Sequence, residues 1–115
     1  MANLNKVMVI GNVGQDPEMR FTPNGKAVTS FSVAVNSKFG EKETTEWISV
    51  VAWAKLAETC NQLQKGSHVF VEGRLQTRSW EKDGVKHYKT EVVASNVQFL
   101  GQRKEAEPWE TEEIE

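Results

Sequence analysis

The stretch EWISVVAWAKLAETCNQLQKG, residues 46–66, decides the fold of this chain. Its first eight residues alternate with period two, which is typical of a β-strand that turns one face toward a core. The core-facing set is Ile48, Val50 and Ala52, within a strand that we expect to span Glu46–Trp53. After this strand the pattern changes from a strand period to a helical one.

The predicted helix spans Ala54–Lys65. Leu56, Cys60 and Leu63 recur at i, i+4 and i+7, so they share one face, on which Cys60 is expected to be a small buried apolar residue. A lysine in the last turn and a glycine immediately after it are a common helix stop. The sequence therefore predicts one helix directly after this strand.

Other β-rich segments, most of them with period two, extend from this unit in both directions. They are Lys6–Val13, Met19–Thr22 and Ala27–Asn36 on one side and His68–Trp80 and Tyr88–Phe99 on the other. Turn residues separate them, and Ser37–Thr45 is expected to be a polar loop. Three long strands, one helix and two long strands predict an all-β fold, a five-stranded OB-fold barrel with one helix between strands 3 and 4. A small β-sandwich has a similar strand count, but the single helix favours the barrel.

Length and composition place the chain among ordinary globular proteins. It has 115 residues, 38% hydrophobic and 26% charged, which is enough for one small domain. No apolar run has the length of a membrane span, and the first residues lack the regions of a signal peptide. Cys60 is the only cysteine, which favours a reducing compartment. We therefore expect a cytoplasmic location.

Charge is distributed unevenly along the chain. Residues 1–104 hold all 14 basic residues and ten of the 16 acidic ones, a net charge of +4, whereas residues 105–115 hold the other six acidic residues. We therefore expect a domain at 1–104 and a short disordered acidic tail at 105–115. A basic body with an acidic tail fits a polyanion-binding domain with a separate partner-binding end. It fits equally well a solvated domain with a disordered tail.

Two tryptophans lie on the outer face of the strand Glu46–Trp53. Trp47 and Trp53 are six positions apart, roughly 20 Å in an extended strand. Exposed rings along a strand can stack bases of any sequence, because every base has a π-face. The ordinary alternative is that both tryptophans are core residues.

The strand His68–Trp80 repeats this arrangement with added charge. Its outward positions are Phe70, Glu72, Arg74, Gln76, Arg78 and Trp80. Arginines between aromatic rings can pair with phosphates while the rings stack bases. More lysines flank this face, namely Lys55, Lys65, Lys82, Lys86 and Lys89. A charged hairpin alone usually means only a solvated face, so these lysines add support without deciding the function.

Eight short stretches in the right order resemble the bacterial-type single-stranded DNA-binding protein family over nearly all of residues 5–101. They are Asn5–Val7, Gly11–Glu18, Pro23–Gly25, Thr45–Trp47, Lys55–Glu58, Lys65–Ser67, Glu72–Leu75 and Thr77–Trp80. The resemblance implies a non-enzymatic OB-fold module that binds and protects single-stranded DNA in replication, recombination and repair. It also implies a homotetramer, in which the strand around Val7–Ile10 helps to pair subunits.

The same resemblance assigns individual residues. The base-stacking positions of the family fall on Phe39, Trp47, Trp53 and Trp80, and two of its cationic positions fall on Lys55 and Arg78. Our expected DNA-binding set also includes the basic residues Lys6, Lys65, Arg74 and Lys82. Other members of the family often carry basic residues at the positions of Ser49, Gln76 and Ser79. We therefore expect a shallower salt dependence of binding than in those members.

The predicted tail departs from the family pattern. Other members have a long Gly/Pro/Gln-rich linker and an acidic tip that ends Ile-Pro-Phe, whereas residues 112–115 here read EEIE. This difference weakens the expectation that replication and repair proteins bind the tail. Trp109 and Ile114 are the candidates for a related partner-binding role.

Other classes of function find less support in the sequence. Neither histidine has a partner at a metal-ligand spacing and no paired carboxylates stand out, so we expect no enzyme, no metal and no cofactor. The GNVG motif at residues 11–14 interrupts β-rich sequence, which fits neither a KH-type RNA clamp nor a P-loop. An OB-fold module for protein or structured RNA stays open, because fold does not determine function. An exposed row of rings and cations would favour DNA over that alternative.

Overall fold

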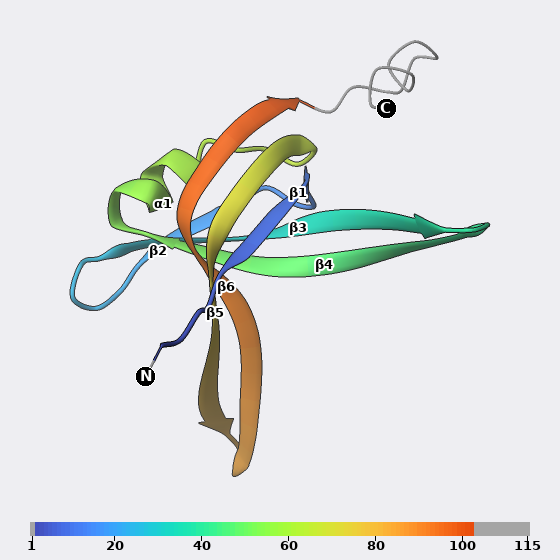
Figure 1. Cartoon of the computed structure of the whole chain (residues 1–115). Helices are drawn as coiled ribbons and strands as arrows, with labels where there is room; N and C mark the ends of the chain where they lie inside the picture. Colours follow the sequence, from blue (N-terminus) through green and yellow to red (C-terminus); the bar gives the residue numbers. More distant parts are fainter. Residues whose placement is uncertain (1, 103–115) are drawn as a thin grey trace.

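The computed structural model describes residues 2–102, which form six strands and one helix (Figure 1). In chain order these are β1 (Val7–Val13), β2 (Glu18–Phe21), β3 (Ala27–Phe39), β4 (Lys42–Trp53), α1 (Ala54–Cys60), β5 (Ser67–Lys82) and β6 (Val85–Gln102). The predicted tail, with Trp109 and Ile114, and the predicted domain end at residue 104 lie outside the described residues. Within residues 2–102, no helix has both the length and the apolar character of a membrane span.

Five of the strands close into a barrel. β1 pairs antiparallel with β5, β5 with β6, and β3 with β4. β4 and β6 run parallel and meet at Val50–Val92, and the end of β1 pairs with β3 at Val13–Val33. The helix α1 follows β4 and precedes β5, the third and fourth strands of the barrel. The predicted five-stranded OB-fold barrel with one helix in this position is confirmed.

Valine fills the barrel interior, as β-branched side chains suit a closed, pleated surface. The almost completely buried valines are Val13, Val33, Val50, Val69, Val71 and Val92. The helix α1 packs against β3, β4 and β6, and the hydroxyl of Thr29 on β3 donates a hydrogen bond to the Ala57 carbonyl (2.6 Å). Cys60 is buried, as predicted, and burial raises the pKa of its thiol to about 11. The thiol therefore stays protonated at neutral pH and lacks the thiolate character of a nucleophile.

The predicted end of the helix at Lys65 is wrong, because α1 ends at Cys60. The amides of Gln62 and Leu63 bond to carbonyls only three residues back, so tight turns replace the helical ladder. Gly66 adopts a φ of +90°, a conformation that glycine takes without strain, and leads the chain into β5. The glycine therefore ends a loop rather than the helix.

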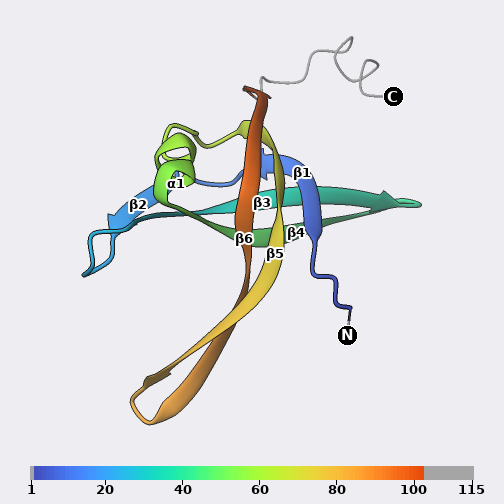
Figure 2. The same ribbon diagram turned by 60° about the vertical axis from the view of Figure 1, so that its left-hand side comes forward.

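Two long hairpins extend beyond the barrel in different directions (Figure 1, Figure 2). In the first, the β3–β4 arm, the strands stay paired out to Phe39 and Lys42. The loop predicted at Ser37–Thr45 is therefore wrong, because only the tip, with Gly40 at a φ of +65°, is a turn. An arm with solvent on both faces needs no apolar residues, so its sequence has the polar composition of a loop.

The second hairpin is the β5–β6 arm, residues 74–91, which stays paired out to Lys82 and Val85. At its root, β6 has a bulge at Ser95, one residue more than the facing β5. A bulge exchanges the faces of all residues beyond it. For this reason Val92 points into the core and Glu91 lies on the outer face, whereas unbroken alternation would place them the other way round.

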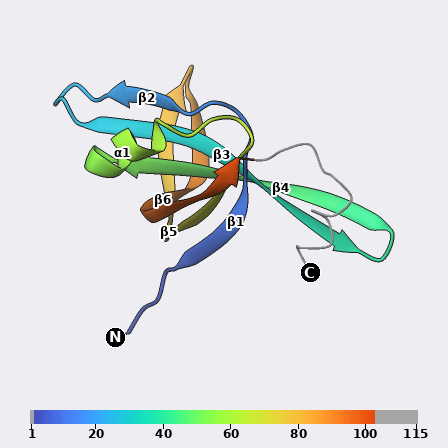
Figure 3. The same cartoon turned by 90° about the horizontal axis from the view of Figure 1, so that it is seen from above.

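The short strand β2 lies along the outer side of β3, away from the rest of the barrel (Figure 3). Its register places Arg20, Val28 and Trp53 in one row across β2, β3 and β4. Directly opposed residues in a sheet share a face, so these three side chains lie on the same outer surface.

Candidate functional site

A cavity of about 390 Å³ lies between the outer surface of β2, β3 and β4 and the root of the β5–β6 arm. Its volume falls within the range of about 300–1,000 Å³ that is usual for ligand sites. The lining residues that matter below are Arg20, Phe21, Trp53, Gln76, Arg78 and Glu91. We call it the arm-side cavity.

Both tryptophans of β4 are exposed, so the alternative that they are core residues is wrong. Trp53, the last residue of β4, is 42% exposed and lines the arm-side cavity. Trp47 is 61% exposed and lies farther along the same face. Its indole rests against the backbone of Gly14, where any side chain would collide with the ring.

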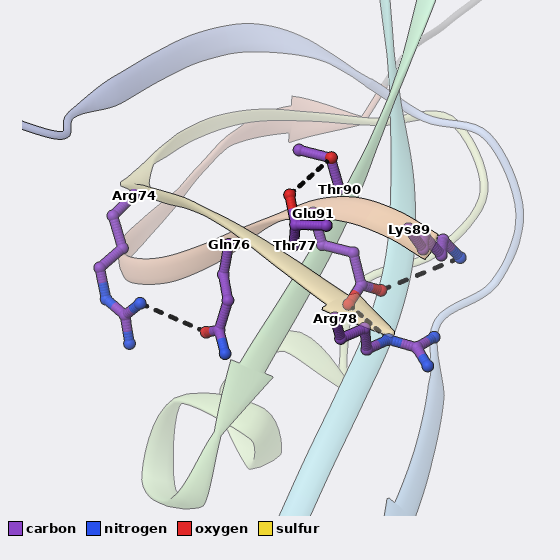
Figure 4. A network of polar contacts seen from close by, with 7 residues as sticks. All are labelled: Arg74, Gln76, Thr77, Arg78, Lys89, Thr90 and Glu91. Atoms are coloured by element: carbon purple, nitrogen blue, oxygen red, sulfur yellow. Dashed lines mark hydrogen bonds and ion pairs between the residues drawn. The ribbon is translucent and has the colours of Figure 1, made fainter. Parts of the chain in front are cut away.

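Glu91 is buried at the arm-side cavity and holds two cationic side chains (Figure 4). Its Oε1 is 2.8 Å from Nε of Arg78, and its Oε2 is 3.9 Å from Nζ of Lys89. A buried carboxylate needs such partners, because desolvation of an unpaired charge costs several kcal/mol. The Arg78 side chain remains half exposed. Its guanidinium is thus anchored through Nε without being removed from solvent.

A row of stacked groups continues from Arg78 along the arm. The Cζ of Arg78 lies 4.8 Å from the ring centroid of Trp80, and Trp80 stacks on His87 with centroids 5.5 Å apart and an interplanar angle of 19°. Trp80 is still 39% exposed. A cation over an exposed indole contributes about 0.5–1 kcal/mol. These contacts hold the ring and the guanidinium together beside the cavity.

A second cavity, of about 560 Å³, lies between the turn that follows β2 and the start of α1. Phe21 and Trp53 line both cavities, so the two spaces adjoin at these rings. Lys26, Lys55 and Glu58 supply the charged lining of this space, which we call the turn-side cavity. Among residues 2–102, neither of the two lysines takes part in an ion pair.

The other predicted site residues lie outside both cavities. Phe39 is 90% exposed at the tip of the β3–β4 arm, and Lys82 is at the tip of the β5–β6 arm. Lys65 follows α1, where its amide donates to the Asp16 carboxylate (2.8 Å). The structure therefore brings together Trp53, Lys55 and Arg78 at the two cavities, with Trp80 in contact with Arg78. Trp47 and these three residues line neither cavity.

Lys6 and Arg74 share a further cavity, of about 590 Å³, between the N-terminal segment and the root of the β5–β6 arm. Lys6 forms an ion pair with Glu72 (2.6 Å), and the hydrogen bond from Lys6 is the main cause that lowers the pKa of that carboxyl. Arg74 donates to the side-chain oxygen of Gln76 (3.2 Å). Both predicted cations thus have partners within the protein.

Sequence reasoning missed Glu91, Phe21 and Arg20 as lining residues. Phe21 and Arg20 fall in a segment that the sequence predicts to be a strand. The only feature of the sequence that could have pointed to a binding role is the aromatic side chain of Phe21 next to a turn. Nothing in the local sequence identifies Glu91, because the bulge decides its face. Within residues 2–102, no three side chains of His, Cys, Asp or Glu lie together as a metal site would require.

Strand order, barrel closure and the position of α1 define an OB-fold protein. Its outer surface carries exposed rings and cations along two adjoining cavities. The chain belongs to the single-strand binding protein family, whose model matches residues 4–100. The family resemblance of the sequence motifs is thereby confirmed.

Two known proteins give the scale of this similarity. Single-stranded DNA-binding protein 1 of Chlorobaculum tepidum is 50% identical over 106 residues, which cover 85% of this chain and 65% of that protein. The chain thus spans just under two thirds of the length of this relative. The structure is also similar to that of a Plasmodium falciparum SSB complex with ssDNA, with a TM-score of 0.79 and 30% identity over 87% of this chain and 97% of that one.

Proposed function

We propose that this chain binds single-stranded DNA without regard to sequence, along the arm-side and turn-side cavities. The observation that carries the proposal is Trp53, a large ring exposed where the two cavities adjoin, with cations on either side. A base can stack on such a ring while the backbone phosphates pair with the cations. Membership of the family and the DNA-bound relative support this proposal. The function is binding and needs no catalytic group.

In this proposal the aromatic residues stack bases and the basic residues bind phosphates. The stacking residues are Phe39, Trp47, Trp53 and Trp80, and the phosphate-binding residues are Lys6, Lys55, Lys65, Arg74, Arg78 and Lys82. Trp47 and Trp53 are six residues apart on β4, roughly 20 Å. Several nucleotides of the bound DNA would therefore lie between the two rings. The ion pairs of Lys6 and Arg78 make these two cations weaker contributors to salt dependence than an unpaired lysine.

The test is quenching of tryptophan fluorescence by oligo-dT at low and at high salt, with duplex DNA of the same length as competitor. We expect quenching that saturates at a fixed ratio of nucleotide to protein and weakens as salt rises. Folded protein that shows no quenching at low salt would refute the proposal. It would leave an OB-fold module for protein or structured RNA.

We further propose a homotetramer in which β1 contributes to the subunit contact. Met8 and Ile10 are exposed on its outer face, and Ile10 lies directly opposite Phe70 of β5. Exposed apolar side chains that gather on one sheet face are typical of association sites. Light scattering after size exclusion should give four copies for the natural chain and a smaller species for Ile10→Glu. A monomer in the natural chain would contradict this part.

The cellular role follows from the same proposal. We infer that residues 1–104 are the DNA-binding part, acting in replication, recombination and repair in the cytoplasm at the nucleoid. Residues 105–115, with Trp109 and Ile114, would be a partner-binding segment for replication and repair proteins. Removal of residues 105–115 should leave the affinity for oligo-dT largely intact. Loss of binding in that variant would contradict the division at residue 104.

A further inference from the structure

We infer that Phe21 and Lys26 form a second nucleotide subsite beside Trp53, in which Phe21 stacks a base and Lys26 binds the adjacent phosphate. The inference rests on the proposed function and adds two residues that the family resemblance did not assign. It comes from the turn-side cavity, which holds an aromatic ring and unpaired cations.

Phe21 has the exposure and the position of a binding residue. It is the last residue of the edge strand β2, is 66% exposed, and lines both cavities together with Trp53. A strand that leaves the base stacked on Trp53 and enters the turn-side cavity therefore meets the ring of Phe21. Stacking would remove this apolar ring from water, which the protein fold itself does not do.

The charges around Phe21 favour a polyanion. Lys26 and Lys55 line the turn-side cavity, and Arg20 lines the arm-side cavity next to it. Among the described residues none of these three cations is in an ion pair. Glu58 is the one acidic residue of the turn-side lining and offsets part of this charge. An unpaired cation gains more from a phosphate than a paired one, because it has no internal partner to give up.

The turn that carries Lys26 is already ordered. The amide of Thr22 donates to the Lys26 carbonyl (2.8 Å), and the amide of Lys26 donates to the Thr22 hydroxyl (3.1 Å). Gly25 adopts a φ of +83°, which this tight turn requires and glycine permits. The backbone at Lys26 therefore needs no ordering on binding, which reduces the entropy that binding would cost.

The first experiment compares Phe21→Ala and Phe21→Leu with the control Phe99→Ala. Phe99 is similarly exposed, at 60%, and lines neither cavity. Affinities are measured for dT oligomers of about 4 to 16 nucleotides, the span of OB-fold sites. Both Phe21 variants should raise the Kd roughly 5- to 100-fold for oligomers that reach the subsite, because neither alanine nor leucine has a π-face on which a base can stack. Leucine keeps the apolar bulk, so its loss of affinity would report the missing ring itself. The control should leave the Kd unchanged.

Photocrosslinking of the natural chain to oligo-dT that carries iododeoxyuridine gives a readout that does not depend on the fold of a variant. Digestion should yield crosslinked peptides that contain Phe21 as well as Trp53. Binding with crosslinks to Trp53 but none to Phe21, and Phe21 variants that bind like the control, would overturn the inference and leave the proposed function intact. Absence of any binding by the natural chain would instead refute the proposed function.

The second experiment uses two opposite charges of the same cavity. Lys26→Gln should weaken binding and reduce the slope of log Kd against log salt by about 0.7, the value for one phosphate of a single strand. Glu58→Gln should tighten binding, because it removes the opposing charge. A change of the Kd in the same direction for both variants, or no change for either, would mean that no phosphate lies in the turn-side cavity.

Discussion

The two cavities that adjoin at Trp53 contain similar side chains but differ in their balance of charge. On the arm side, Arg78 and Lys89 are held by the buried carboxylate of Glu91. On the turn side, Lys26 and Lys55 have no such partner among the described residues. Internal pairing fixes where a cation lies, whereas a free cation keeps its full charge for a ligand.

This difference predicts a division of work along the proposed DNA path. The arm side would set the position of the strand, because the Arg78 guanidinium is held by Glu91 and by the ring of Trp80, which itself stacks on His87. The turn side, with unpaired Lys26 and Lys55 against the one unpaired Arg20 of the arm side, would supply the larger part of the salt-dependent affinity, because counterion release follows the charge that phosphates neutralise. Each of the following variants strengthens or contradicts this division.

The largest effect is expected for Trp53→Ala, because Trp53 belongs to both cavities. The Kd for oligo-dT should rise by a factor that corresponds to about 1–3 kcal/mol, the value general to OB-fold grooves of this family rather than one calculated for this chain. Trp53→Phe should retain most of the affinity. Fluorescence or anisotropy titrations measure both variants, with thermal unfolding as the check of folding. A folded Trp53→Ala variant that binds as tightly as the natural chain would contradict the shared role.

The next effect concerns stability on the arm side. Arg78→Ala leaves the buried Glu91 with only the distant Lys89, so the free energy of unfolding should fall by about 1–2 kcal/mol, less than for a fully buried pair because Arg78 is half exposed. Glu91→Gln should cost less, because Arg78 can turn to water. Chemical denaturation of the double variant gives the sharpest test. The double variant should be more stable than Arg78→Ala alone, because it removes the carboxylate that lost its partner. If the two have the same free energy of unfolding, Glu91 does not need Arg78 as a charge partner.

The same pair distinguishes the two cavities in binding. Glu91→Gln frees Arg78 and Lys89, which adds two unpaired cations to Arg20 on this side, so the dependence of the Kd on salt should become steeper. An unchanged slope would mean that these cations do not meet phosphates even when they are free.

A smaller effect involves the helix that carries Lys55. Cys60 is the last residue of α1 and its side chain is buried in the core, where burial raises the pKa of its thiol from 9.0 to about 11. A raised folded-state pKa means that its contribution to stability is complete below pH 9 and is lost as pH rises through 11. The loss should reach about 1.4 kcal/mol at pH 10. Between pH 8 and pH 11 the free energy of unfolding, measured by chemical denaturation, should therefore fall less in Cys60→Ala than in the natural chain. The same fall in both proteins would contradict this prediction.

Alternation along β4 was enough to predict one part of this site. The exposed tryptophans and the core set Val50 and Ala52 follow from period two, because β4 is regular from end to end. The barrel follows from the order of strands and helix. These features depend on local pattern, which the sequence carries directly.

The charge pairing could not be predicted in the same way. Arg78 and Glu91 are 13 residues apart, and the bulge at Ser95 decides that Glu91 faces Arg78 rather than the core. A bulge is set by packing against the facing strand, where Gly73 leaves room for a close approach, and not by a residue pattern within β6. Phe21 became a candidate only when the fold placed the β2 turn beside the start of α1.

The smallest expected effect is at Ala54, which joins Trp53 to Lys55. Ala54 has a φ of +57°, in the left-handed region that costs a side-chain-bearing residue about 1–2 kcal/mol. Ala54→Gly relieves that cost but adds freedom to the unfolded chain, about 0.5–1 kcal/mol, so stability should rise by roughly 0.5 kcal/mol. Oligo-dT affinity should not change, because glycine accepts the same φ and leaves Trp53 and Lys55 in place. Ala54→Val, with its branched side chain, should destabilise instead, and a stabilised valine variant would show that this junction is not strained.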